Sequence, residues 1–216
     1  MYEELIFRLI FLILTFLFLG IRGYYGRKAQ PPGQKRTRQE RWADQVKYES
    51  KGLVIFRIVV VYAMILFIVL WSLLPFLLPI WTQFIVPNGI RWTGVGICIV
   101  MTFALLWVGH HLDRQVSGTL EIKAGHSLVT SGLYKYIRHP MYLVYFIFNL
   151  GLLLISVNLV LLIIIVLGMV VMIVRLPTEE KMLIDQFGEE YRKYMRHTGR
   201  LLPKLRRSIE NQDYSE

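Results

Sequence analysis

Long apolar stretches alternate with short, strongly charged stretches along the chain. Three apolar runs, at residues 5–21, 53–74 and 90–109, are close to the roughly 20 residues that an α-helix needs to cross a bilayer. A fourth run, at 141–174, has no charged side chain and is too long for one upright span but short for two. Because the sequence ISVN at 155–158 interrupts it, we predict a tight hairpin of two short spans, with a single tilted helix as the alternative.

The pattern predicts an all-α fold: a polytopic integral membrane protein with about five transmembrane helices and a cytoplasmic C-terminal helix. The chain is 55% hydrophobic, more than a soluble domain of this length needs for its core. We expect a single domain over 1–216. Generic spans and a basic loop occupy about 1–110, the candidate chemistry lies at about 121–203, and 204–216 form a polar tail.

The amphipathic pattern after the last apolar run predicts the C-terminal helix. Pro177 suits a first helical turn, and the acidic pair that follows it favours the positive end of a helix. Apolar residues then recur at helical spacing with charges between them. Gly199 and Pro203 are expected to end this helix.

The charge distribution predicts the orientation. The net charge is +10, and the loop 22–51 holds nine basic and three acidic residues. The positive-inside rule places this loop in the cytoplasm and the N-terminus outside. With five spans, 110–140 and everything after Arg175 also become cytoplasmic, in the plasma or inner membrane if the owner is prokaryotic. The basic charge is expected to face anionic lipid rather than nucleic acid.

Cysteine and histidine usage gives no support for a disulfide or a metal site. The single cysteine, Cys98, lies in an apolar run. His110 and His111 are adjacent and point apart on a helix, and neither forms a metal-binding spacing with His126 or His139. We therefore expect no metal.

Polar side chains gather just before the fourth apolar run. The stretch 126–142 contains two histidines, an arginine and three tyrosines: His126, Tyr134, Tyr136, Arg138, His139 and Tyr142. Each alone could be an interfacial anchor, but together they form a dense hydrogen-bonding surface. Pro140 suits the first turn of the following helix, whose N-terminus can bind a carboxylate.

A second polar group, RLPTEE at 175–180, closes the last apolar run. Arg175 and Glu179 are four residues apart, so they share a face if the helix continues through Pro177 and flank a kink if it does not. The simpler interpretation of Arg175 is a snorkelling side chain. The acids beside it favour a site, because they can hold a cationic group while the arginine clamps a carboxylate.

Both groups together resemble the isoprenylcysteine carboxyl methyltransferase family, in its short prokaryotic type with five spans. The matching blocks are GHSLVTSGLYKYIRHPMY (125–142) and RLPTEEKMLIDQFGEEYRKYMRHTGRLLP (175–203). The resemblance implies S-adenosylmethionine as methyl donor and S-adenosylhomocysteine as product. It also implies transfer to the carboxylate of a lipidated, prenylcysteine-like substrate that enters from the bilayer to the cytoplasmic face.

The resemblance also implies the site residues, with the C-terminal helix completing the cofactor site. The cofactor-binding residues would be His126, Ser127, Leu128, Val129, Tyr134, His139, Pro140, Met141, Tyr142 and Glu179. Arg175 would face the substrate carboxylate, so Arg175 and Glu179 are the predicted catalytic residues. The sequence departs from the family pattern at Val144, at 197–199 and near Thr119. These departures bear on the identity of the substrate more than on that of the methyl donor.

The predicted reaction needs no general base, because an α-carboxylate with a pKa of about 3.3–3.7 is already ionised near neutrality. An N-methyltransferase for phospholipids or other lipid amines is the alternative; it would need a base, for which Glu180 or His139 could serve. A nicotinamide-dependent sterol-type reductase is more distant, because the acidic pair opposes a nucleotide phosphate. A non-enzymatic lipid-binding protein would leave both polar groups unexplained. Membrane lipids are expected partners, and no obligate protein partner is evident.

Overall fold

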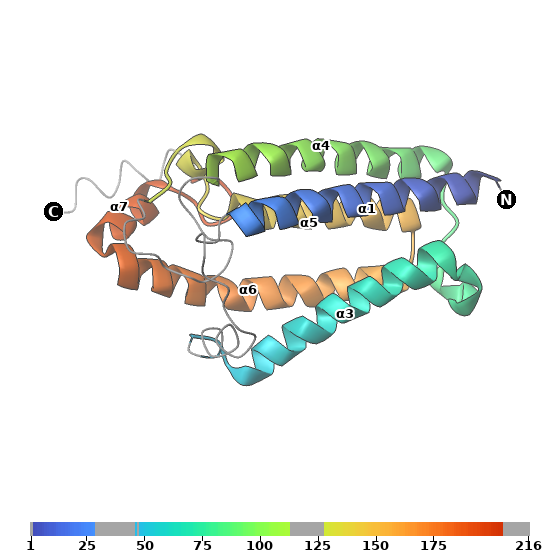
Figure 1. Ribbon diagram of the computed structural model, residues 1–216, viewed down its shortest axis with the longest axis horizontal. Helices are drawn as coiled ribbons and strands as arrows, with labels where there is room; N and C mark the ends of the chain where they lie inside the picture. The colour runs from blue at the N-terminus through green and yellow to red at the C-terminus, as the bar shows by residue number, and fades with distance from the viewer. Residues whose placement is uncertain (1, 29–45, 47, 113–127, 205–216) are drawn as a thin grey trace.

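The computed structural model describes residues 2–28, 46, 48–112 and 128–204, and its regular elements there are all helices (Figure 1). The α-helices are α1 (Tyr2–Lys28), α3 (Lys51–Leu73), α4 (Asn88–Leu112), α5 (Pro140–Ser156), α6 (Leu159–Phe187) and α7 (Glu189–His197). Single 3-10 turns lie between some of them: η1 (Pro75–Leu77), η2 (Ile80–Thr82) and η3 (Gly132–Lys135). The predicted all-α fold is confirmed.

Four of these helices, α1, α3, α4 and α6, are long and apolar enough to cross a membrane. The fifth, α5, is apolar but has only 17 residues. The helices α1, α3 and α4 contain the predicted spans 5–21, 53–74 and 90–109 to within one residue. The protein is therefore an integral membrane protein with four to five spanning helices, as the apolar pattern predicts.

The helices form a bundle with α7 at one end and the N-terminus at the other (Figure 1). The helices α1, α4 and α5 pack together, while α3 packs against α6 on the other side of the molecule. The helices α5 and α6 also contact each other, so α5 links the two groups. This arrangement brings the start of α3, the start of α5 and the last turns of α6 to the same end.

One stripe of α1 supplies much of the apolar core. Phe7, Phe11, Leu14 and Phe18 are buried and recur at the spacing of one helix face. The ring of Phe18 stacks on Phe148 of α5 at 3.7 Å. The opposite face of α1 remains exposed and apolar, as expected for a surface in contact with lipid.

Small residues set the close crossing of α4 and α5. A Cβ added to Gly94 would lie 2.6 Å from the carbonyl oxygen of Gly151, and one added to Gly151 would lie 2.6 Å from Cys98 Sγ. Small residues let helix backbones approach closely inside a membrane. Cys98 is therefore a buried packing residue at this crossing.

The uncharged run is a hairpin, so the alternative of one tilted helix is wrong. Val157 leaves α5 in the left-handed region with φ 46°, and Asn158 caps α6 by accepting a hydrogen bond from Val160 N–H at 2.9 Å. The buried Asn158 amide also donates to Thr82 Oγ1 at 3.1 Å. These contacts satisfy the polar groups that a chain reversal leaves open.

An ion pair joins α1, α4 and α5 near this hairpin. Arg91 of α4 pairs with Glu4 of α1 and donates from Nε to the carbonyl oxygen of Ile155 at 2.9 Å. The Arg91 guanidinium also lies 3.9 Å from the centre of the Phe7 ring. This contact ties together the ends of the helices that lie far from α7.

The predicted boundaries of the C-terminal helix are wrong at its start. Instead of beginning at Pro177, α6 continues through this proline to Phe187. The break comes at Gly188, which has φ 56° and separates α6 from the short α7. Proline lacks one backbone donor but does not end a helix that neighbouring elements hold in place, whereas a positive φ favours glycine.

Candidate functional site

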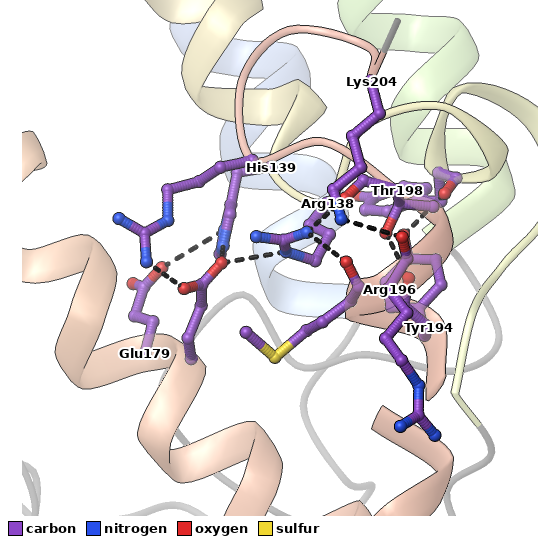
Figure 2. Close-up of polar contacts among 11 residues, drawn as sticks. Arg138, His139, Glu179, Tyr194, Arg196, Thr198 and Lys204 are labelled. Atoms are coloured by element: carbon purple, nitrogen blue, oxygen red, sulfur yellow. Dashed lines mark hydrogen bonds and ion pairs between the residues drawn. The ribbon is translucent and has the colours of Figure 1, made fainter. Parts of the chain in front are cut away.

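Two polar networks lie where α5 begins and α6 ends. The first, here called the docking network, consists of Arg138, Glu180, Thr198 and Arg200, of which Figure 2 labels Arg138 and Thr198. Arg138 donates from Nε to Glu180 Oε1 at 2.9 Å and from Nη1 to the carbonyl oxygen of Thr198. Arg200 pairs with the other oxygen of Glu180. Because the Arg138 and Glu180 side chains are almost completely buried, this network fixes the C-terminal segment against α6.

Backbone hydrogen bonds reinforce the docking network. Arg138 N–H donates to the carbonyl oxygen of Gly199 at 2.8 Å, and His139 N–H donates to that of Arg200 at 3.1 Å. Gly199 N–H donates back to the carbonyl oxygen of Tyr136 at 3.1 Å. The segment before α5 is thus held by the segment after α7, which sets the position of His139.

The second network, here called the Arg175 cluster, consists of Glu49, Arg57, Tyr142, Arg175 and Glu179. Arg175 Nε lies 2.8 Å from Glu49 Oε1 and 3.0 Å from Glu179 Oε1. Tyr142 donates from its hydroxyl to Glu179 Oε1 at 2.5 Å. Arg57 donates from Nη1 to Glu49 Oε1 at 3.4 Å. Side chains from α3, α5 and α6 therefore converge with that of Glu49, which lies just before α3.

His139 lies between the two networks. Its Nδ1 is 3.8 Å from Glu179 Oε2, and its Nε2 is 3.5 Å from Glu180 Oε1 (Figure 2). Within the described residues, the buried Nε2 has no partner with hydrogen-bond geometry. The imidazole is therefore close to both carboxylates of the acidic pair.

The structure places the predicted site residues in two neighbouring groups. The residues His139, Pro140, Tyr142, Arg175 and Glu179 meet where α5 begins and the last turns of α6 lie. Because α6 continues through Pro177, Arg175 and Glu179 share a face, as the continuous-helix alternative predicts.

The remaining predicted cofactor residues lie nearer to α7 or to the apolar core. Val129 is buried, and Tyr134 and Met141 pack against the core. Leu128 lines an open pocket of about 280 Å³. On the α7 side, Glu190, Lys193 and Tyr194 line the same pocket. His126, Ser127 and Thr119 lie outside the described residues.

A half-buried tyrosine joins this pocket to the segment before α5. Tyr194 donates from its hydroxyl to the carbonyl oxygen of Tyr134 at 2.6 Å. Burial raises the pKa of Tyr194 to about 12, although Arg138 and the hydrogen bond with Thr198 oppose that rise. The phenol therefore stays protonated, and able to donate, throughout the physiological range.

Sequence reasoning missed the roles of Glu49 and Arg57, and it named Arg138 only as a member of the polar group before α5. Glu49 counted only as one acid of a basic loop, yet its side chain is fully buried between two arginines. The available signal was an acid directly before the helix cap Ser50, whose hydroxyl accepts from Leu53 N–H. Arg138 instead belongs to the docking network.

The described residues contain no group of three or more His, Cys, Asp or Glu side chains able to hold a metal ion. His126, one of the histidines considered from the sequence, is not among them. The alternative use of Glu180 as a general base has little support, because two guanidinium groups already bind its buried carboxylate.

The fold and the two networks define a class: an integral membrane protein that gathers charged side chains at one end of its apolar helices. Residues 94–185 match the model of the isoprenylcysteine carboxyl methyltransferase (ICMT) family. The match includes His139, Tyr142, Arg175 and Glu179. It does not include Glu49 or Arg57.

Curated relatives extend this likeness. The chain is 29% identical over 173 residues to the methanethiol S-methyltransferase of Pseudomonas deceptionensis, covering 70% of this chain and 60% of the relative. It is 27% identical over 138 residues to the protein-S-isoprenylcysteine O-methyltransferase of Tribolium castaneum, covering 57% and 48%. The matched part is therefore less than two thirds of the length of either relative.

One solved structure is similar over most of the chain. The eukaryotic intramembrane Ras methyltransferase ICMT aligns with a TM-score of 0.44 and 18% identity, covering 90% of this chain and 67% of that one.

Proposed function

We propose that this protein transfers a methyl group from S-adenosylmethionine to the carboxylate of a lipidated, prenylcysteine-like substrate at the cytoplasmic membrane face. The observation that carries this proposal is the Arg175 cluster, where Arg175 and Glu179 present opposite charges on successive turns of α6. The cluster lies at the end of apolar helices, and its members Tyr142, Arg175 and Glu179 fall within the family-matched region.

The residues present fit a sulfonium donor. The donor would supply a methyl group on a positively charged sulfur, and its ammonium group would pair with Glu179. Tyr142 would orient that carboxylate through the hydrogen bond it already donates. His139 Nε2 is a buried polar atom without a hydrogen-bond partner among the described residues, and it would serve the polar end of the donor.

Arg175 would orient the acceptor carboxylate for in-line attack. Because that carboxylate is ionised near neutrality, the site needs alignment more than proton transfer. Alignment of bound reactants can contribute about 7–11 kcal/mol. A tight clamp would also stabilise the ground state, so Arg175 would act mainly on orientation.

Apolar surface beside the site supports entry of a lipid from the bilayer. Ile173 and Val174, directly before Arg175 on α6, are each about half exposed. An acyl or prenyl chain could lie along this surface while its polar end reaches Arg175. We expect membrane lipids to occupy the same surface when no substrate is bound.

Methyl transfer to a small thiol is the second candidate, because one relative is a methanethiol S-methyltransferase. A small thiol is largely protonated near neutrality and must lose its proton before it attacks. Nearby guanidinium groups would favour the thiolate, and Arg57 and Arg175 would supply them. The same cluster would then stabilise a different anion.

Calorimetric titration with S-adenosylhomocysteine tests the donor site directly. Incubation with labelled donor and a farnesylcysteine analogue, methanethiol or a lipid amine then identifies the acceptor. A base-labile labelled product from the farnesylcysteine analogue is expected, because it indicates an ester. Absence of both S-adenosylhomocysteine binding and methyl transfer would refute the proposal.

A further inference from the structure

Glu49 lies outside the family-matched region, yet it contacts a residue at the centre of that region. It directly precedes the Ser50 cap of α3, and its carboxylate is completely buried. It pairs with Arg57 of α3 at 3.3 Å and with Arg175 of α6 at 2.8 Å. A buried carboxylate is costly unless it is paired, so two guanidinium partners suit this position.

Arg175 is shared between two carboxylates rather than committed to one. Its Nε is within 3.0 Å of both Glu49 and Glu179. Within the described residues, however, this buried nitrogen has no partner at hydrogen-bond angles. The guanidinium can therefore favour either carboxylate with a small rotation.

We infer that Glu49 is a positioning residue for Arg175, anchored by Arg57, and that it keeps Arg175 from neutralising Glu179. The inference rests on the proposed function, because it assigns Glu179 to the donor's ammonium group. When a ligand cation engages Glu179, Glu49 still holds Arg175 beside the acceptor. Glu49 thus separates the two charges that the site needs.

The charge balance of the cluster predicts what removal of Glu49 would do. Glu49 and Glu179 offset Arg57 and Arg175, and these four groups interact electrostatically. In Glu49→Gln, one acid would face two arginines, so Arg175 would move onto Glu179. The pair would then compete with any cationic ligand for that carboxylate.

The test is a double-mutant cycle read by S-adenosylhomocysteine affinity. We expect Glu49→Gln to weaken binding about 10-fold, within the range that coupled neighbours show. In Glu49→Gln/Arg175→Ala, affinity should recover to within about 2-fold of Arg175→Ala alone, because no arginine then competes for Glu179. A merely structural role would give losses that add in the double variant, and that result would overturn the inference.

Glu4→Gln is the matched control, because it also removes an acid from a buried arginine, but far from the site. It should leave affinity unchanged, and an equal loss there would overturn the inference by pointing to general destabilisation. If Glu49→Gln does not fold, Glu49→Asp keeps the charge on a shorter side chain and enters the same cycle. Wild-type protein that binds no S-adenosylhomocysteine would refute the proposed function itself, whereas additive losses in an active protein would refute only the role of Glu49.

Discussion

At the scale of single residues, the Arg175–Glu179 pair gives the site its polarity. The two side chains contact each other because α6 keeps its helical spacing across Pro177. Each also has a partner outside α6, Glu49 for Arg175 and Tyr142 for Glu179. The pair can therefore separate without leaving either charge alone.

Substitution Arg175→Ala should reduce kcat about 100-fold, because loss of alignment can cost that much even when binding survives. S-adenosylhomocysteine affinity should change by less than about 3-fold, well below the loss expected when a charged hydrogen-bonding partner is removed. Single-turnover kinetics and calorimetry measure the two quantities. Collapse of donor affinity with turnover intact would reverse the assigned role.

Substitution Glu179→Gln should instead weaken S-adenosylhomocysteine binding by about 10- to 100-fold, the equivalent of one charged hydrogen bond. Calorimetric titration measures this change. Asp185→Asn, an exposed acid later on α6, is the matched control and should bind normally. Equal affinities for Glu179→Gln and wild type would contradict a donor site at Glu179.

The sequence led us to expect Tyr142 and Glu179 close together, because both stand in motifs that resemble one family, and the two side chains are hydrogen-bonded. It did not allow prediction of Glu49. Of its two partners, Arg175 lies on a helix far along the chain, and the position of the acid before the Ser50 cap does not indicate that contact. The partners of Arg138 could not be predicted either, since they are set by how the C-terminal segment folds back.

At the scale of elements, the docking network fixes the α5 start against α6 and the segment after α7. Arg138→Gln should destabilise the protein by about 3–5 kcal/mol, the typical effect of breaking a buried ion pair. Chemical unfolding in detergent measures it. Arg192→Gln, which removes an exposed pair with Glu189, should cost less than about 1 kcal/mol. Equal effects of the two substitutions would contradict the docking role.

The contact between Tyr194 and Tyr134 should respond to alkaline pH. Because the folded state raises the pKa of Tyr194 from 10.0 to about 12, its contribution is complete below pH 10. That contribution is lost as pH rises towards 12, since the unfolded phenol ionises first. As pH rises through this window, the melting temperature of Tyr194→Phe should therefore fall less steeply than that of the wild type. Parallel curves would show that Tyr194 does not contribute this dependence.

Element boundaries followed from the sequence where composition changes sharply, as at the three predicted spans. The C-terminal helix was placed wrongly because a proline suggests a helix start, while packing of α6 against α3 and α5 carries the helix past it. Gly188 was the actual break, and its positive φ is invisible in a hydropathy pattern.

At the scale of the whole molecule, the α4–α5 crossing links the site to the membrane bundle. Gly94→Val should destabilise the protein by about 1–3 kcal/mol, because the added side chain would overlap the Gly151 backbone. Gly96→Val is the control, since a Cβ there meets no atom within 4 Å. Thermal unfolding in detergent distinguishes them. Equal melting temperatures would show that the crossing tolerates separation.

The hairpin between α5 and α6 also sets how deep the Arg175 cluster lies. The helices α5 and α6 both adjoin the reversal at Val157–Asn158. At a rise of 1.5 Å per residue, Tyr142 lies about 21 Å from this reversal along α5, and Arg175 lies about 24 Å from it along α6. Hydrocarbon is about 30 Å thick. A reversal at one edge of the hydrocarbon would therefore leave the Arg175 cluster short of the opposite edge, whereas the longer α6 would extend beyond it. In the proposed reaction, a lipidated acceptor could then present its carboxylate to Arg175 while its apolar chain stays in the leaflet.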